Sequence, residues 1–204
     1  MLKICLFIIL TALVAYNNDS VSEHHLNMQE NHILTDENDY QCKIVYNDHD
    51  DVLGQHRKET QSMQWFALTH PMMRPILKEK DYLNSKAAIL TIGKNTFLSV
   101  NIVIGSKDAN KAYGIIEKGS EMRIALVNGR NIIIKSENRA DSKVFPLQNQ
   151  VTYNIVYKLK KDDIKSLLGK EIDKVGIMWS SGYEDYEVFN VDLIMNQLNC
   201  LLNG

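Results

Sequence analysis

The sequence predicts a mainly β fold: an antiparallel β-sandwich-like domain with one short connecting helix and a C-terminal helix, with α+β as the alternative. Short apolar runs alternate with turn residues from residue 40 onward, and helical spacing appears only after residue 160. Helices therefore do not alternate with strands, as they would in a parallel α/β fold. Asn128-Gly129 between two β-branched runs indicates a tight hairpin, since a type I′ turn requires positive φ at both positions.

The individual strands are predicted from apolar runs and from the turns that bound them. Residues 93–95 (Gly-Lys-Asn) and 180–182 (Ser-Ser-Gly) each mark a hairpin turn, and residues 48–54 read as an acidic loop. Pro71 and Pro75 interrupt regular secondary structure after the second apolar run. The segment around them, residues 72–82, should therefore be irregular or briefly helical. The predicted strands are residues 41–46, 60–68, 87–92, 97–104, 113–116, 122–127, 131–135, 151–157, 175–179 and 186–189.

Two helices are expected near the end of the chain. The first covers residues 161–168, with Asp162 and Asp163 in a first turn where the helix dipole favours anions, and with Gly169 as its C-cap. Asn190 should cap the second helix at its N-terminus. Apolar side chains then recur at helical spacing, at Ile194, Leu198, Leu201 and Leu202.

The first fifteen residues have the pattern of an export signal. Lys3 precedes an apolar run over residues 4–15, which is shorter than the roughly 20 residues that a spanning helix needs. Residues 13–15 (Leu-Val-Ala) resemble the lipobox of a bacterial lipoprotein, but Tyr16 stands where the lipidated cysteine would be. We therefore expect export to the periplasm or the cell surface without a lipid. Cleavage near residue 15 and retention of a short anchor both remain open.

The rest of the chain divides into a tether and one folded domain. Residues 16–38 are polar and poor in aromatic side chains, which predicts a flexible tether, and residues 39–204 form a single β-rich domain. The formal net charge is −2 with no basic block, so we expect no nucleic-acid partner. Any membrane association would run through the N-terminal segment alone.

Cys42 and Cys200 lie near the two ends of the folded part, while the third cysteine, Cys5, belongs to the signal. In an oxidising compartment the pair could form a disulfide, which would stabilise by about 5 kcal/mol in the chain-entropy model. The alternative is two separate buried thiols. Neither cysteine has the spacing of a zinc or redox motif, and no cofactor is expected.

Residues 157–167 (YKLKKDDIKSL) and 171–177 (EIDKVGI) form a strand–helix–strand pattern. Together with the export signal and the tether, this pattern resembles the late part of small exported, lipoprotein-like β-rich proteins of Bacteroidota. The resemblance implies an exported β-rich domain, and it implies no catalytic residue. Tyr16 departs from the lipoprotein pattern, as described above.

The acidic loop offers weak candidates for metal ligands. Counted from Asp48, Asp50 and Glu59 fall at the third and twelfth positions of an EF-hand loop. Val52 occupies the fifth position and Leu53 the glycine position, so the pattern fails where it is most diagnostic. We therefore expect a solvated acidic turn and no metal.

The segment 179–187 holds three aromatic and three acidic residues around one predicted turn. One interpretation is a ligand face made by Trp179, Tyr183, Glu184 and Tyr186, with rings that stack on a sugar and carboxylates that accept its hydroxyls. A second is an ordinary hairpin with Trp179 in the core. A third pairs Glu184 with a neighbouring acid, Asp185 or Glu187, as in a glycosidase.

No sequence motif of a nucleophilic or nucleotide-dependent enzyme occurs in the chain. The leading functional hypothesis is therefore an exported cell-envelope domain that binds a protein or a glycan without catalysis. An envelope inhibitor or immunity protein directed against a toxin or hydrolase is the alternative. A carboxylate-dependent hydrolase is the second alternative.

Overall fold

The structure, a computed structural model, describes residues 42–77 and 81–203, which contain eleven β-strands and four α-helices. They belong to one compact unit, Asn38–Gly204. The predicted export signal (1–15) and tether (16–38) lie outside the described residues. No helix of the described part is long and apolar enough to cross a membrane. The mainly β, sandwich-like fold class is confirmed.

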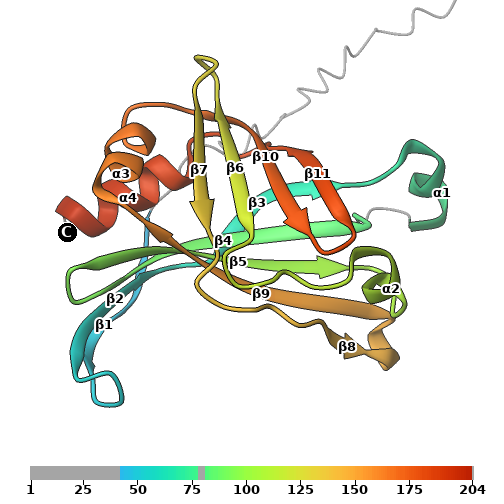
Figure 1. The fold of residues 1–204 in the computed structure, drawn as a ribbon, viewed down its shortest axis with the longest axis horizontal. Helices are drawn as coiled ribbons and strands as arrows, with labels where there is room; N and C mark the ends of the chain where they lie inside the picture. Colours follow the sequence, from blue (N-terminus) through green and yellow to red (C-terminus); the bar gives the residue numbers. More distant parts are fainter. Residues whose placement is uncertain (1–41, 78–80, 204) are drawn as a thin grey trace, which may run out of the picture. The chain divides into compact units, whose positions relative to one another are not determined.

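The strands form two antiparallel sheets (Figure 1). The larger sheet has seven strands in the order β1-β2-β4-β5-β9-β8, with β3 beside β4, and the smaller sheet has the order β11-β10-β6-β7. The bounds are β1 Ile44–Asp50, β2 Gln55–Thr60, β3 Met63–Leu68, β4 Leu83–Ile92, β5 Asn95–Ile104, β6 Glu121–Leu126, β7 Asn131–Lys135, β8 Lys143–Phe145, β9 Gln150–Leu159, β10 Ile172–Trp179 and β11 Gly182–Glu187.

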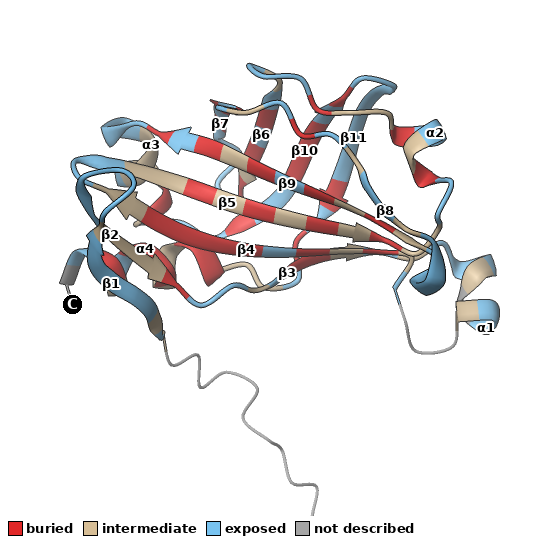
Figure 2. Cartoon of the chain, turned by 90° about the horizontal axis from the view of Figure 1, so that it is seen from below, coloured by how far each residue is buried: buried red, intermediate tan, exposed pale blue. Residues whose placement is uncertain are grey.

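The strands of the two sheets cross steeply in both views (Figures 1 and 2), as in an orthogonal β-sandwich. Isolated bridges join the sheets at two corners: Phe66 pairs with Val188, and Ser136 pairs with Tyr157. These bridges bring β11 next to β3 and β7 next to β9 at their ends. The apolar interior is thus enclosed on two sides by main-chain pairing.

Strand alternation places the core between the sheets. On β9, Val151, Tyr153, Ile155 and Tyr157 are all buried, which confirms the alternation predicted for this segment. Red bands recur along β5 and β9 in Figure 2 at the same period, whereas β4 has a continuous buried run over residues 87–90. The smaller sheet contributes the facing side chains Met122, Ile124, Val175 and Ile177.

The helices are short, except for the one at the C-terminus. They are α1 (Arg74–Leu77), α2 (Ala109–Tyr113), α3 (Lys161–Leu167) and α4 (Leu193–Asn203), with 3₁₀ turns η1 (Pro71–Met73) and η2 (Pro146–Gln148). The helix predicted at residues 161–168 is confirmed as α3, and the Lys160 N–H donates to Asp163 Oδ2 (2.8 Å) at its first turn. The prediction that Gly169 is its C-cap is wrong, because the helix ends at Leu167 and Leu168 is the cap residue, in a right-handed conformation. The prediction that Asn190 caps α4 is wrong. Its side chain instead donates to the Gln64 carbonyl of β3 (3.4 Å), and the helix begins at Leu193.

Three local predictions are corrected by the main-chain pairing and backbone angles of the structure. The loop expected at 48–54 shrinks to a turn, because β1 continues to Asp50 and pairs with β2. Residues 113–116 are not a strand, since α2 ends at Tyr113 and Ile116 makes only an isolated bridge. The turn at Asn128-Gly129 joins β6 and β7 as expected, but positive φ (81°) occurs at Gly129 and not at Asn128. It is therefore not a type I′ turn.

Candidate functional site

The segment that sequence reasoning singled out forms the β10–β11 hairpin, and strand alternation divides it between two faces. Met178 pairs with Tyr183 and Ile177 with Glu184. Trp179, Glu184 and Tyr186 consequently lie on the core side, whereas Tyr183, Asp185 and Glu187 lie on the outer side. The four predicted ligand residues therefore do not share one face, because neighbouring side chains of a strand point in opposite directions.

Trp179 and Tyr186 belong to the core, at 2% and 1% exposure. The Trp179 ring meets the rings of Tyr113 and Tyr153 edge-on, with centroids 5.0 Å away in each case. Its Nε1–H donates to Tyr186 Oη (3.0 Å), and the Tyr186 hydroxyl donates to Glu184 Oε2 (2.7 Å). Burial and the Glu184 carboxylate raise the pKa of Tyr186 well above its usual range. These rings are packed against protein and have no open face for a sugar.

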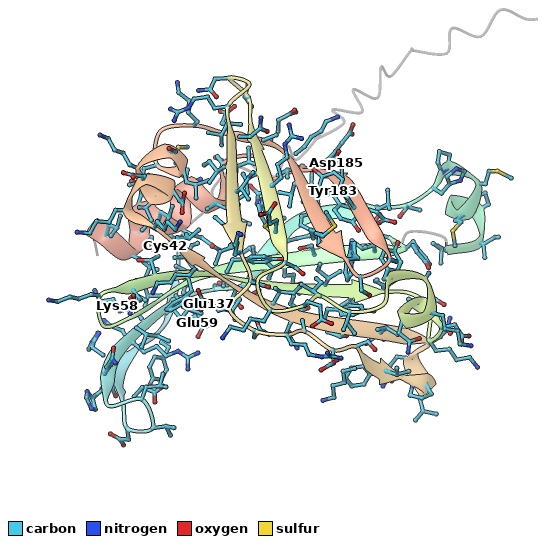
Figure 3. The ribbon with its side chains drawn as sticks, viewed as in Figure 1. Cys42, Lys58, Glu59, Glu137, Tyr183 and Asp185 are labelled. Carbon is cyan, nitrogen blue, oxygen red and sulfur yellow. A yellow bond between two sulfur atoms is a disulfide. The ribbon has the colours of Figure 1, made fainter. Side chains whose placement is uncertain are left out.

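Tyr183 is 42% exposed, but its ring lies across the backbone of Gly176 on the neighbouring strand. Its hydroxyl donates to Asp185 Oδ1 (2.6 Å), and both residues project from the outer side of the hairpin (Figure 3). A Cβ at position 176 would overlap the Tyr183 phenol, so the ring fills the space that the missing side chain leaves.

Alternation also separates the carboxylates of the proposed glycosidase pair. Glu184 faces the core side, where it accepts the Tyr186 hydroxyl, while Asp185 and Glu187 face outward. A glycosidase needs two carboxyl groups that flank one bond from opposite sides of the same cleft. Glu184 does not form such a pair with either neighbour.

The acidic side chains of the β1–β2 hairpin gather around a cation that the protein itself supplies. Arg57 lies 3.6 Å from Asp50 and 2.5 Å from Glu59, and its guanidinium stands over the Tyr46 ring at 5.2 Å. Asp48 pairs with Arg57 in the strand register. Within residues 42–77 and 81–203 no three His, Cys, Asp or Glu side chains are grouped to hold a metal ion.

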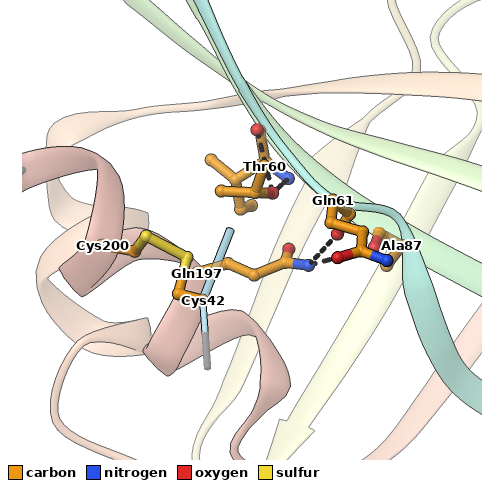
Figure 4. The surroundings of a disulfide bond; sticks show 7 residues. Cys42, Thr60, Gln61, Ala87, Gln197 and Cys200 are labelled. Carbon is orange, nitrogen blue, oxygen red and sulfur yellow. Dashed lines mark hydrogen bonds between the residues drawn. A yellow bond between two sulfur atoms is a disulfide. The ribbon is translucent and has the colours of Figure 1, made fainter. Parts of the chain in front are cut away.

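Cys42 and Cys200 are joined in a disulfide that ties the start of the described chain to α4 (Figure 4). Beside it, the buried Gln197 side chain donates to the carbonyls of Gln61 (3.0 Å) and Ala87 (3.2 Å). The bond and these two hydrogen bonds hold α4 against β4 and the end of β2. This arrangement serves the fold, and it exposes no reactive thiol.

A groove of about 570 Å³ lies at one end of the larger sheet, where β4 and β9 begin and β5 ends, beside α1 and η2. It is on the face of the larger sheet turned away from the core, because its residues Asn84 and Val103 alternate with the buried Leu83 and Ile104. Its volume is within the range of about 300–1,000 Å³ that ligand sites occupy. Five carboxamide residues line it: Gln64, Asn84, Gln148, Asn149 and Gln150.

Two of the lining residues are oriented by hydrogen bonds. Asn149 adopts a left-handed backbone conformation (φ 52°), and its Oδ1 accepts from the Lys107 N–H (3.2 Å). Asp81 accepts the Thr69 hydroxyl (2.8 Å). Leu77 and Val103 contribute the apolar part of the lining. The groove thus combines two oriented polar side chains and further carboxamides with a smaller apolar part.

Strongly exposed apolar side chains occur in two of the segments that contribute lining residues, and we call Met72, Ile76 and Leu147 the apolar banks. Ile76, next in sequence to the lining residue Leu77, is 77% exposed, and Leu147, next in sequence to the lining residue Gln148, is 97% exposed. Met72, in the η1 turn just before α1, is 79% exposed. α1 and β8, the strand just before η2, lie at the same end of the larger sheet in both views (Figures 1 and 2). Apolar side chains at a polar groove are typical of interaction surfaces.

No protein-family model, curated protein or solved structure matches the chain. The choice of site therefore rests on geometry. Sequence reasoning missed the groove because its residues come from positions 64, 77, 81, 84, 103, 105 and 148–150, which only the strand order brings together.

Proposed function

We propose that this protein is an exported, non-catalytic domain of the cell envelope that binds a partner protein through the carboxamide groove and its apolar banks. The observation that carries the proposal is a groove lined by five carboxamide residues, with the exposed Ile76 and Leu147 next in sequence to its lining residues Leu77 and Gln148. Interfaces typically combine desolvated apolar anchors with polar groups that fix orientation. The groove and banks offer both within one end of the larger sheet.

A protein ligand is favoured over a glycan by the kind of side chain that is exposed. The predicted sugar platform, Trp179 and Tyr186, is buried in the core. The exposed apolar side chains at the groove are aliphatic or thioether groups, which bury well against protein side chains. They offer no flat π-face against which a sugar ring could stack.

Export is part of the proposal, and two features support it. The apolar run at residues 4–15 follows a single cation, as in a signal peptide. The disulfide between Cys42 and Cys200 is of the kind that persists in oxidising compartments. A partner of the groove would therefore be found in the envelope.

Site-specific photo-crosslinking in the native host tests the proposal. A photoreactive amino acid would replace Leu147 or Gln150 in the full chain, and Lys158 would serve as the control position. Lys158 lies on the same strand and the same face as Gln150, at the other end of β9. The expected result is one protein crosslinked from both groove positions and not from the control. Equal labelling from all three positions, or none from the groove, contradicts the proposal.

A further inference from the structure

We infer that the groove binds an extended peptide segment of its partner and reads the main chain of that segment through carboxamide side chains. The inference rests on the proposed function and adds the form of the ligand. It concerns the central part of the groove, between the two apolar banks. There, Asn84 and Gln150 project from regular strands, and they are the carboxamides that would contact the ligand main chain.

The dimensions of the groove suit a short extended segment. Its residues come from four strands that are neighbours in the sheet: Gln64 on β3, Asn84 on β4, Val103 on β5 and Gln150 on β9. Adjacent strands lie about 4.8 Å apart, so three spacings give a length of about 14 Å. An extended chain rises about 3.3 Å per residue, and about four residues would therefore cross the groove.

Carboxamides match the peptide main chain in chemistry. The side chain of Asn or Gln carries a carbonyl acceptor and an NH₂ donor in one plane, as a peptide unit carries C=O and N–H. Among the residues that the structure places, the side chains of Asn84, Gln64 and Gln150 form no hydrogen bond. Their donors and acceptors are thus available to a ligand. Main-chain recognition of this kind tolerates many ligand sequences.

The apolar banks would receive side chains that an extended ligand directs outward. Ile76 belongs to α1, Met72 to the adjoining turn η1, and Leu147 to η2, and all three side chains are strongly exposed. Apolar ligand residues at the two ends of the segment would bury area against these banks, which favours binding. The partner sequence should accordingly be apolar at its flanks and variable between them.

Phage-displayed random peptides are the probe that tests the inference, with the full-length protein as target. Affinities of enriched peptides would be measured for wild type, N84A and Q150A, with N154A as the control. Asn154 is an exposed carboxamide on the same face of β9, bonded to Asn101 and outside the groove. Each groove substitution should weaken binding about fivefold or more, as the loss of one hydrogen bond predicts, and N154A should change it less than twofold.

Chemical variants of an enriched peptide separate main-chain from side-chain recognition. N-methylation of a central residue should weaken binding about tenfold, whereas alanine replacement of the same residue should change it less than threefold. Far-UV circular dichroism would show that N84A and Q150A remain folded. These are substitutions of partly exposed strand residues with small expected effects on stability.

Three outcomes overturn the inference. One is a peptide whose affinity is unchanged in both groove variants. Another is the absence of any enriched peptide that depends on the groove, and groove-dependent binding to a glycan array would then assign the site to a sugar. The last is a partner crosslinked from positions 147 and 150 whose segments do not bind as peptides. That result leaves the proposed function intact and shows that the partner docks as a folded surface.

Discussion

Gly176 and Tyr183 provide a sharp test of how the outer face of the smaller sheet is built. Gly176 is buried in the middle of β10, opposite Asp185 on β11, and the Tyr183 ring covers it. An alanine Cβ at this position would overlap the phenol and come within 2.7 Å of Asp185 Oδ1. G176A must therefore displace the ring, and we expect this displacement to break the hydrogen bond between Tyr183 and Asp185.

The expected sign of the effect follows from three contributions. The lost hydrogen bond costs about 1 kcal/mol, since the pair is exposed. Exposure of about 40 Å² more of the ring costs about 1 kcal/mol at 25 cal/mol per Å². Replacement of a glycine by alanine in a strand interior stabilises the fold by about 0.5–1 kcal/mol, because glycine loses more conformational entropy on folding. G176A should thus destabilise the wild-type protein by about 1 kcal/mol, and the same change should stabilise the Y183A background by about 0.5–1 kcal/mol.

Urea denaturation of wild type, G176A, Y183A and the double variant measures whether the effect of G176A on the unfolding free energy changes sign. Trp65 and Trp179 are both buried, so tryptophan fluorescence should report unfolding. G169A is the matched control, because no atom lies near its added Cβ, and its effect should be the same with and without Tyr183. If G176A has the same sign in both backgrounds, the ring is not seated on Gly176. Tyr183 would then be free to serve a ligand.

Further predictions concern the disulfide, the buried tyrosines and Gln197. Replacement of Cys42 and Cys200 together by Ala should lower the unfolding free energy by about 2–5 kcal/mol, because the bond spans a sequence separation of 158; urea denaturation with and without reductant checks this. Burial raises the pKa of Tyr157, and burial with Glu184 raises that of Tyr186, so both stay neutral in the fold. Stability from these groups should therefore be complete below about pH 10 and fall above it, as unfolded tyrosines ionise; a late rise in phenolate absorbance should coincide with unfolding. Q197A should cost about 2–4 kcal/mol through two lost hydrogen bonds and a cavity, whereas N199A at an exposed position of α4 should cost under about 0.5 kcal/mol; thermal denaturation compares them.

Local sequence patterns were sufficient to predict an element wherever one segment determines its own secondary structure. The alternation of Val151, Tyr153, Ile155 and Tyr157 identified both the strand β9 and the face that it buries. The acidic first turn at residues 161–163 located the start of α3. In both cases the period of the side chains selects the element and its orientation together.

The ligand-face interpretation of residues 179–187 failed over one strand boundary, whereas the alternative of an ordinary hairpin with Trp179 in the core agrees with the structure. The sequence prediction began the second strand at residue 186, which left Tyr183 and Glu184 in a turn where their side chains could share a face. The strand begins at Gly182 instead, and the turn is correspondingly short. Once both residues belong to a strand, they must point to opposite sides, so the ligand face disappears and Trp179 is left in the core.

The groove could not be predicted by any local argument, because Asn84, Val103 and Gln150 meet only through the order β4-β5-β9. Polar residues at strand ends are ordinary, and none of the three is unusual in its own segment. These three strands are also the longest, with ten residues each and an unbroken register between them, so the central positions of the groove are held by the most extensive pairing in the sheet. The banks, in contrast, are carried by turns of three or four residues at the sheet's end. Substitutions in α1 and η2 should accordingly change which ligand is preferred. Substitutions at Asn84 and Gln150 should instead weaken the binding of every ligand by a similar factor.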